Sequence, residues 1–115
     1  MAHSLKEERD KYITDLDLAL RHVVDTLGAN PQVQRVIVFG SYADGRRDLF
    51  TDLDILVIME TDQEFIARSA KLLQSLHTGV DMDLIVYTPH EFESIQNKSF
   101  WKHALKNSQV LYERK

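Results

Sequence analysis

Asp52 and Asp54, separated by one leucine at the start of an apolar run, are the residues of this sequence best placed to do chemistry. If the run is a β-strand, both carboxylates point to the same face, about 7 Å apart along the chain. Two neighbouring carboxylates repel each other unless a cation lies between them. Because Mg²⁺ binds carboxylate oxygens together with phosphate oxygens, the pair predicts a metal site that also holds a phosphorylated substrate.

A Gly-Ser pair, Gly40-Ser41, follows the apolar run Val36–Phe39, and ten residues separate it from Asp52. At the turn that leaves a strand, backbone N–H groups and a serine hydroxyl can bind phosphate oxygens. The same two residues could instead serve only as a turn and a helix cap. Combined with the two aspartates, the pair predicts a site for a metal-bound nucleoside triphosphate.

A third carboxylate is expected on a later strand, where Asp81 and Asp83 precede the apolar run Leu84–Val86. Strand alternation places both side chains on one face, so periodicity alone does not choose between them.

The spacing Gly-Ser, ten residues, Asp-x-Asp resembles the nucleotidyltransferase signature of the DNA polymerase β superfamily. Over nearly the whole chain, the sequence looks most like the minimal nucleotidyltransferases, small chains often paired with a helical HEPN partner. The segment Val80–Glu93, with its Tyr-Thr-Pro turn, is similar to the later strand of that family, and the endings Phe100–Leu105 and Val110–Glu113 also fit.

The resemblance implies roles for particular residues. It favours Asp83 over Asp81 as the third carboxylate, so that Asp52, Asp54 and Asp83 are expected to be catalytic and to bind two Mg²⁺ ions. Gly40 and Ser41 are expected to bind the nucleotide. Position 44 is commonly basic in relatives but is Asp44 here; Arg46 and Arg47 are assigned to contact phosphate instead, with a solvated loop position as the alternative for each.

The function implied by the resemblance is transfer of a nucleoside monophosphate, AMP from ATP, to a hydroxyl acceptor. The expected acceptor is a tyrosine of a HEPN-type toxin, which the enzyme would neutralise as an antitoxin. Two alternatives remain open: a homodimer that modifies a small molecule such as an aminoglycoside, and a non-catalytic module that only binds its partner.

Composition narrows the classes of protein. The 115 residues are 43% hydrophobic and 28% charged, which predicts one globular domain over residues 1–115. The absence of cysteine excludes disulfides and thiolate metal sites. A net charge of −4 argues against stable binding to duplex nucleic acid. No apolar run has the length of a membrane span, so a cytoplasmic location is expected.

The predicted elements alternate between helices and strands, which indicates an α/β (α+β) fold with a mixed sheet and flanking helices, as in the polymerase β-like palm that the resemblance implies. Strands are expected at Val33–Phe39, Leu53–Met59, Gly79–Tyr87 and Val110–Tyr112. A helix over Ile13–Leu27 ends at Gly28, and a short helix runs through Trp101 and Leu105. Two capping boxes, Thr61–Glu64 and Thr88–Glu91, predict helix starts, the first opening an apolar helical stripe. That stripe consists of Phe65, Ile66, Leu72, Leu73 and Leu76.

Overall fold

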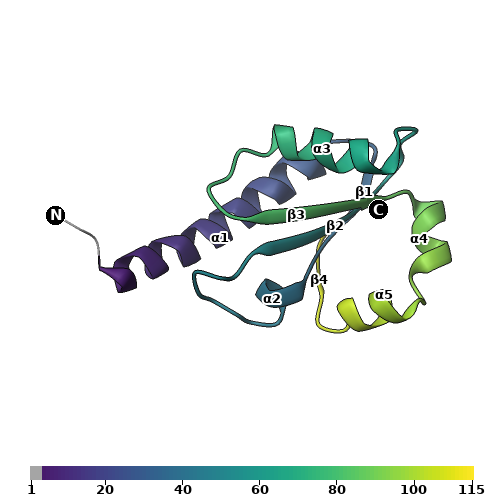
Figure 1. Cartoon of the computed structure of the whole chain (residues 1–115). Helices are drawn as coiled ribbons and strands as arrows, with labels where there is room; N and C mark the ends of the chain where they lie inside the picture. Colours follow the sequence, from purple (N-terminus) through teal and green to yellow (C-terminus); the bar gives the residue numbers. More distant parts are fainter. Residues whose placement is uncertain (1–3) are drawn as a thin grey trace.

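The computed structural model describes residues 4–115 and shows helices on both sides of a four-stranded sheet (Figure 1). The strands lie in the order β3-β2-β1-β4. The elements in chain order are α1 (Leu5–Gly28), β1 (Val33–Phe39), α2 (Gly40–Ala43), β2 (Leu53–Met59), α3 (Phe65–Ser75), β3 (Met82–Tyr87), α4 (Pro89–Ile95), α5 (Ser99–Ala104) and β4 (Gln109–Glu113).

The sheet is mixed, as the sequence predicts. Strand β1 pairs antiparallel with both β2 and β4, whereas β2 and β3 run parallel. The two inner strands have the predicted bounds, because their apolar residues are covered from both faces. The third strand begins at Met82, later than the predicted Gly79, and the last is an edge strand as predicted.

Alternation along the strands divides the core between the two faces of the sheet. Val36 and Val38 pack in one cluster with α1 residues such as Leu16. Ile37 and Phe39 point the other way, into a second cluster that contains Phe92 of α4 and Trp101 of α5. Leu72 of α3 and Leu76, which directly follows this helix, also pack in the first cluster. Helices α1 and α3 therefore cover one face, and α4 and α5 cover the other (Figure 1).

The two predicted capping boxes have different outcomes. At Thr88 the box forms with Glu91, and Pro89 occupies the first turn of α4. At Thr61 the prediction is wrong: the hydroxyl accepts from the backbone N–H of Gln63, and α3 begins only at Phe65. A threonine hydroxyl satisfied within a local turn is no longer free to cap a helix.

The stripe predicted on α3 is buried only in part. Leu76 is buried at the end of the helix and Leu72 is partly buried, while Ile66 is 81% exposed. Arg68, a residue outside the predicted stripe, is the buried one on this helix. Within residues 4–115, no helix combines the length and the hydropathy that crossing a membrane requires.

Candidate active site

Three strand ends place the acidic residues next to one another. Phe39, the last residue of β1, pairs with Asp54 of β2, which in turn pairs with Asp83 of β3. Gly40, where the phosphate turn begins, directly follows Phe39. Because Asp54 alternates with the core residue Ile55, its side chain faces the side of the sheet that carries α4 and α5.

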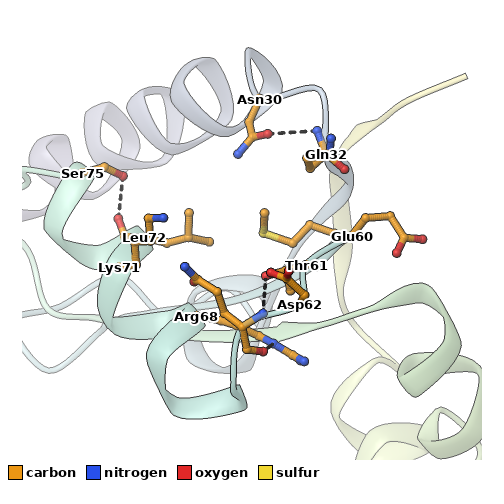
Figure 2. Close-up of a pocket in the computed structure, with 11 residues that line it drawn as sticks. Asn30, Gln32, Glu60, Thr61, Asp62, Arg68, Lys71, Leu72 and Ser75 are labelled. Atoms are coloured by element: carbon orange, nitrogen blue, oxygen red, sulfur yellow. Dashed lines mark hydrogen bonds between the residues drawn. The ribbon is translucent and has the colours of Figure 1, made fainter.

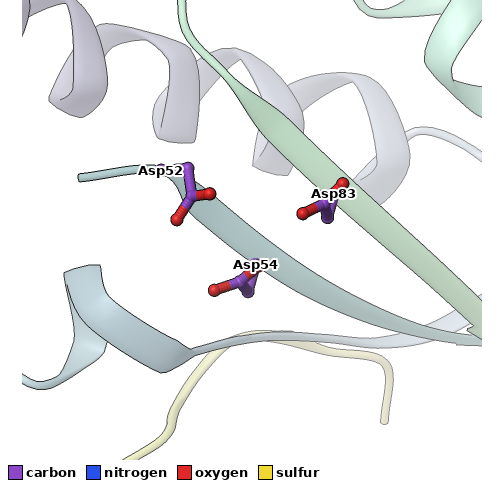
Figure 3. Close-up of side chains that lie close together, drawn as sticks. All are labelled: Asp52, Asp54 and Asp83. Atoms are coloured by element: carbon purple, nitrogen blue, oxygen red, sulfur yellow. The ribbon is translucent and has the colours of Figure 1, made fainter. Parts of the chain in front are cut away.

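Asp52, Asp54 and Asp83 form one cluster, in which a carboxylate oxygen of each residue lies within 4.8 Å of those of the other two (Figure 3). Asp52 and Asp54 are half-buried, and Asp83 is exposed. Burial, then the charges of Asp52 and Asp83, raise the pKa of Asp54 to about 6. The cluster concentrates negative charge of the kind that a divalent cation would neutralise.

Asp81, the alternative third carboxylate, does not belong to this cluster. It lies just before β3, so strand alternation does not govern its side chain. Its backbone is engaged instead: the carbonyl accepts from the N–H of Leu53 at 3.0 Å. The geometry thus brings Asp83 together with the Asp-x-Asp pair, as the resemblance implies.

Gly40 is fixed by the carboxylate beside it. Its φ of +73° lies in a region that other residues rarely adopt. A Cβ at this position would lie 2.1 Å from Oδ2 of Asp54. Any other residue would therefore strain the turn and displace an aspartate of the cluster.

Ser41 also contacts the cluster. Its hydroxyl donates to Oδ1 of Asp52 at 3.3 Å, which joins α2 to the start of β2. This contact places Gly40 and Ser41 beside the carboxylates, while their binding of phosphate stays a prediction.

Arg46 contacts its own loop, and Arg47 contacts the preceding helix α2. The Nε of Arg46 donates to both carboxylate oxygens of Asp48, at 2.9 and 3.1 Å. Arg47 donates to the carbonyl of Tyr42 at 2.7 Å, and its guanidinium lies 3.6 Å from the centre of that ring. Asp44 accepts from Asn107 at 3.2 Å. Phosphate binding by either arginine stays a prediction and would require it to leave or share these partners.

Tyr12 supports the site and was missed by the sequence analysis. From α1, its hydroxyl donates to the carbonyl of Thr51 at 2.8 Å and accepts from the N–H of Asp81 at 3.4 Å. The tyrosine thus ties together the segments that lead into β2 and β3. The only sequence signal was a tyrosine at helical spacing before Leu16, which is more often a core residue than a support for a site.

A sizeable cavity lies away from the three aspartates. With a volume of about 770 Å³, it is bordered by the segment Glu60–Gln63 at the far end of β2 and by α3 residues such as Lys71 (Figure 2). None of the three clustered aspartates lines it. The chemistry of the carboxylates, and not the size of a cavity, therefore identifies the candidate site.

Comparison with known proteins bears on this geometry. A family model described as "Polymerase beta, Nucleotidyltransferase" matches residues 21–115. A protein of Methanocaldococcus jannaschii, provisionally named a protein adenylyltransferase, is 34% identical over 82 residues, which are 70% of this chain and 80% of that protein.

Two solved structures have a similar fold. A provisionally assigned nucleotidyltransferase from Sulfolobus solfataricus gives a TM-score of 0.56 at 18% identity, covering 99% of this chain and 91% of that one. A mutant of the toxin–antitoxin complex MntA–HpeT gives a TM-score of 0.51 at 21% identity, covering 86% of this chain and 73% of that one. At 18% and 21% identity, the similarity to these two structures shows a shared fold alone.

Proposed function

Since this chain is a nucleotidyltransferase of the polymerase β family, we propose that it transfers AMP from ATP to a tyrosine of a HEPN-type toxin and thereby acts as a metal-dependent antitoxin. The observation that carries the proposal is the cluster of Asp52, Asp54 and Asp83. The name of the Methanocaldococcus jannaschii relative, a protein adenylyltransferase, supports a protein as the acceptor. A similar fold in a complex titled as a toxin–antitoxin pair supports the class of partner.

The residues of the cluster fit divalent metal ions. They supply carboxylate oxygens close together, and burial, followed by the charges of Asp52 and Asp83, raises the pKa of Asp54. Asp52 and Asp54 would hold two Mg²⁺ ions, and Asp83 would hold one of them. Such ions, when bound, neutralise the charge that develops on the attacking and leaving oxygens.

The proposed reaction is a displacement at the α-phosphorus of ATP. The phenolic oxygen of the acceptor tyrosine forms a bond to that phosphorus. The bond from the same phosphorus to the oxygen that bridges the α- and β-phosphates breaks, and pyrophosphate leaves with that oxygen. The phenolic proton passes to a carboxylate, for which the exposed Asp83 is best placed because an acceptor can approach it from solvent. Ser41 and the backbone at Gly40 would orient the triphosphate from the opposite side of the cluster.

A direct test uses the protein encoded by the neighbouring gene, which the proposal expects to be of the HEPN type. Incubated with this chain and Mg-ATP, the neighbour should gain one or more AMP groups by intact mass, and fragmentation should place them on tyrosine. The Asp83→Asn variant and a reaction with EDTA are the controls. An unmodified neighbour together with a modified aminoglycoside would contradict the proposal, as would a tight complex that is never modified.

A further inference from the structure

A chain of ring contacts runs from the first residue of α3, over the last residue of β3, to α5. Phe65 lies 5.3 Å from Tyr87 between ring centres, Tyr87 lies 5.8 Å from Trp101, and Trp101 lies 4.9 Å from Phe100. Trp101 is buried, but Phe65 and Phe100 are 43% and 62% exposed. The two exposed rings are thus linked through the half-buried Tyr87 and the buried Trp101, and we call Phe65, Tyr87, Trp101 and Phe100 the aromatic patch. Exposed rings held by such a shared aromatic base differ from apolar residues scattered singly over a surface, which need no explanation.

Tyr87 and Trp101, at the centre of the aromatic patch, lie on the face of the sheet toward which Asp54 points. Along β3, Asp83 and Tyr87 are four residues apart and point to the same side, a separation of about 13 Å. A standard interface covers about 800 Å² of each partner, equivalent to a disc of about 16 Å radius. A protein centred on the patch would therefore extend over the carboxylate cluster.

Three lysines lie in or next to α5, the helix that carries Phe100. Lys98 and Lys102 flank Phe100 in the sequence, Lys106 follows, and all three are exposed. Among residues 4–115 no carboxylate forms an ion pair with any of these lysines. In a chain whose net charge is −4, this local positive charge favours a partner with carboxylates at the matching position.

On the basis of the proposed function, we infer that the aromatic patch is the docking surface for the acceptor protein. The acceptor places an apolar surface against Phe65 and Phe100 and sets carboxylates opposite Lys98, Lys102 and Lys106. Docking there brings the acceptor hydroxyl to the carboxylate cluster and turns an encounter between two molecules into a reaction within one complex.

The experiment measures the Kd between this chain and the HEPN-type neighbour by calorimetry, without nucleotide. Phe65→Ser and Phe100→Ser should each weaken binding about tenfold or more, because exposed aromatic anchors carry much of the energy of an interface. Leu18→Ser is the matched control, since Leu18 is 56% exposed on α1, which covers the other face of the sheet. Its Kd should stay within about twofold of the parent value.

One further measurement excludes a trivial loss of folding in the patch variants, and another tests the role of the lysines. The thermal shift produced by Mg-ATP should be the same in the patch variants as in the parent. Replacing Lys98, Lys102 and Lys106 together with glutamine should slow association and reduce its dependence on salt, as expected when exposed charges steer a partner.

The outcomes separate this inference from the proposed function. If the patch variants bind and modify the neighbour as the parent does, the docking surface is wrong while the proposed function stands. If the patch is required for binding but the neighbour is never modified, the docking surface stands and the proposed function fails. A parent chain that forms no complex overturns both, and a patch that instead holds two copies of this chain together, seen by light scattering, overturns the docking surface.

Discussion

Ionisable groups near the two ends of β3 are in opposite electrostatic states. At its start, burial and then the charges of Asp52 and Asp83 raise the pKa of the neighbouring Asp54 to about 6. Beyond its end, the carboxylate of Glu91 accepts from Arg68 at 2.6 and 3.2 Å. That hydrogen bonding, followed by a bond from the backbone of Thr88, lowers the pKa of Glu91 to about 2. The pair Arg68–Glu91 stabilises the fold, whereas the three aspartates keep like charges together, as expected of a cation-binding site.

The largest effect is expected at the three aspartates. In Asp52→Asn/Asp54→Asn, transfer activity should fall by about a thousandfold or more, because both ligands assigned to the two metals are lost. Fold stability should change little or rise, since the repulsion is relieved. Activity assays and thermal shifts with and without Mg-ATP measure both effects. An equal shift by Mg-ATP in parent and variant would show that these aspartates do not bind the metal-nucleotide complex.

The Asp83→Asn variant separates the role of the cluster in nucleotide binding from its role in the transfer step. Because Asp83 is exposed on the side open to an acceptor, the variant should keep nucleotide affinity within a few fold and lose about a hundredfold in transfer rate. Asp81→Asn is the control and should have a milder effect, since Asp81 lies outside the cluster. An inactive Asp81→Asn beside an active Asp83→Asn would reverse the assignment of the third carboxylate.

Breaking the pair Arg68–Glu91 should reduce the stability of the fold without directly affecting catalysis. Glu91→Gln leaves the buried guanidinium of Arg68 without its carboxylate and should lower the free energy of unfolding by about 1–2 kcal/mol, a value limited by the exposure of Glu91. Asp15→Asn, which breaks the exposed pair with Lys11, should change it by less than about 0.5 kcal/mol. Urea denaturation compares the two variants; equal values would show that burial adds nothing to the inner pair.

The sequence predicts the inner strands well and the start of α3 poorly, for different physical reasons. Continuous apolar runs bounded by polar residues define Val33–Phe39 and Leu53–Met59 to the residue. The start of α3 depends on whether Thr61 bonds to a helix or to its own turn, and the two patterns look alike in sequence.

The candidate site shows the same limit. The proximity of Asp52 and Asp54 needs only strand alternation, but that of Asp54 and Asp83 depends on the register between β2 and β3, which no local pattern fixes. The pair Arg68–Glu91 was not predicted, because its residues are 23 positions apart and lie on different helices.

The smallest expected effect is a pH dependence that Asp54 imposes on stability. Its folded pKa of about 6 lies above the ordinary 3.8, so the folded state holds the proton more tightly than the unfolded state does. The resulting stabilisation is complete below about pH 4 and is lost as the pH rises through 6, a change of about 1 kcal/mol because water reaches part of the carboxyl. Glu91 acts in the opposite sense at lower pH: its stabilisation is present above its ordinary pKa of 4.5 and is lost as the pH falls towards 2.

Urea denaturation of the parent and Asp54→Asn in EDTA, at pH 4.5 and pH 7, isolates the effect of Asp54, because Glu91 is present in both proteins. The variant should gain stability relative to the parent at pH 7, and the gain should shrink at pH 4.5 and also at pH 7 when Mg²⁺ is added to the parent. A gain that is the same at both pH values would show that the carboxylate cluster does not carry the uncompensated charge on which the comparison between the two ends depends.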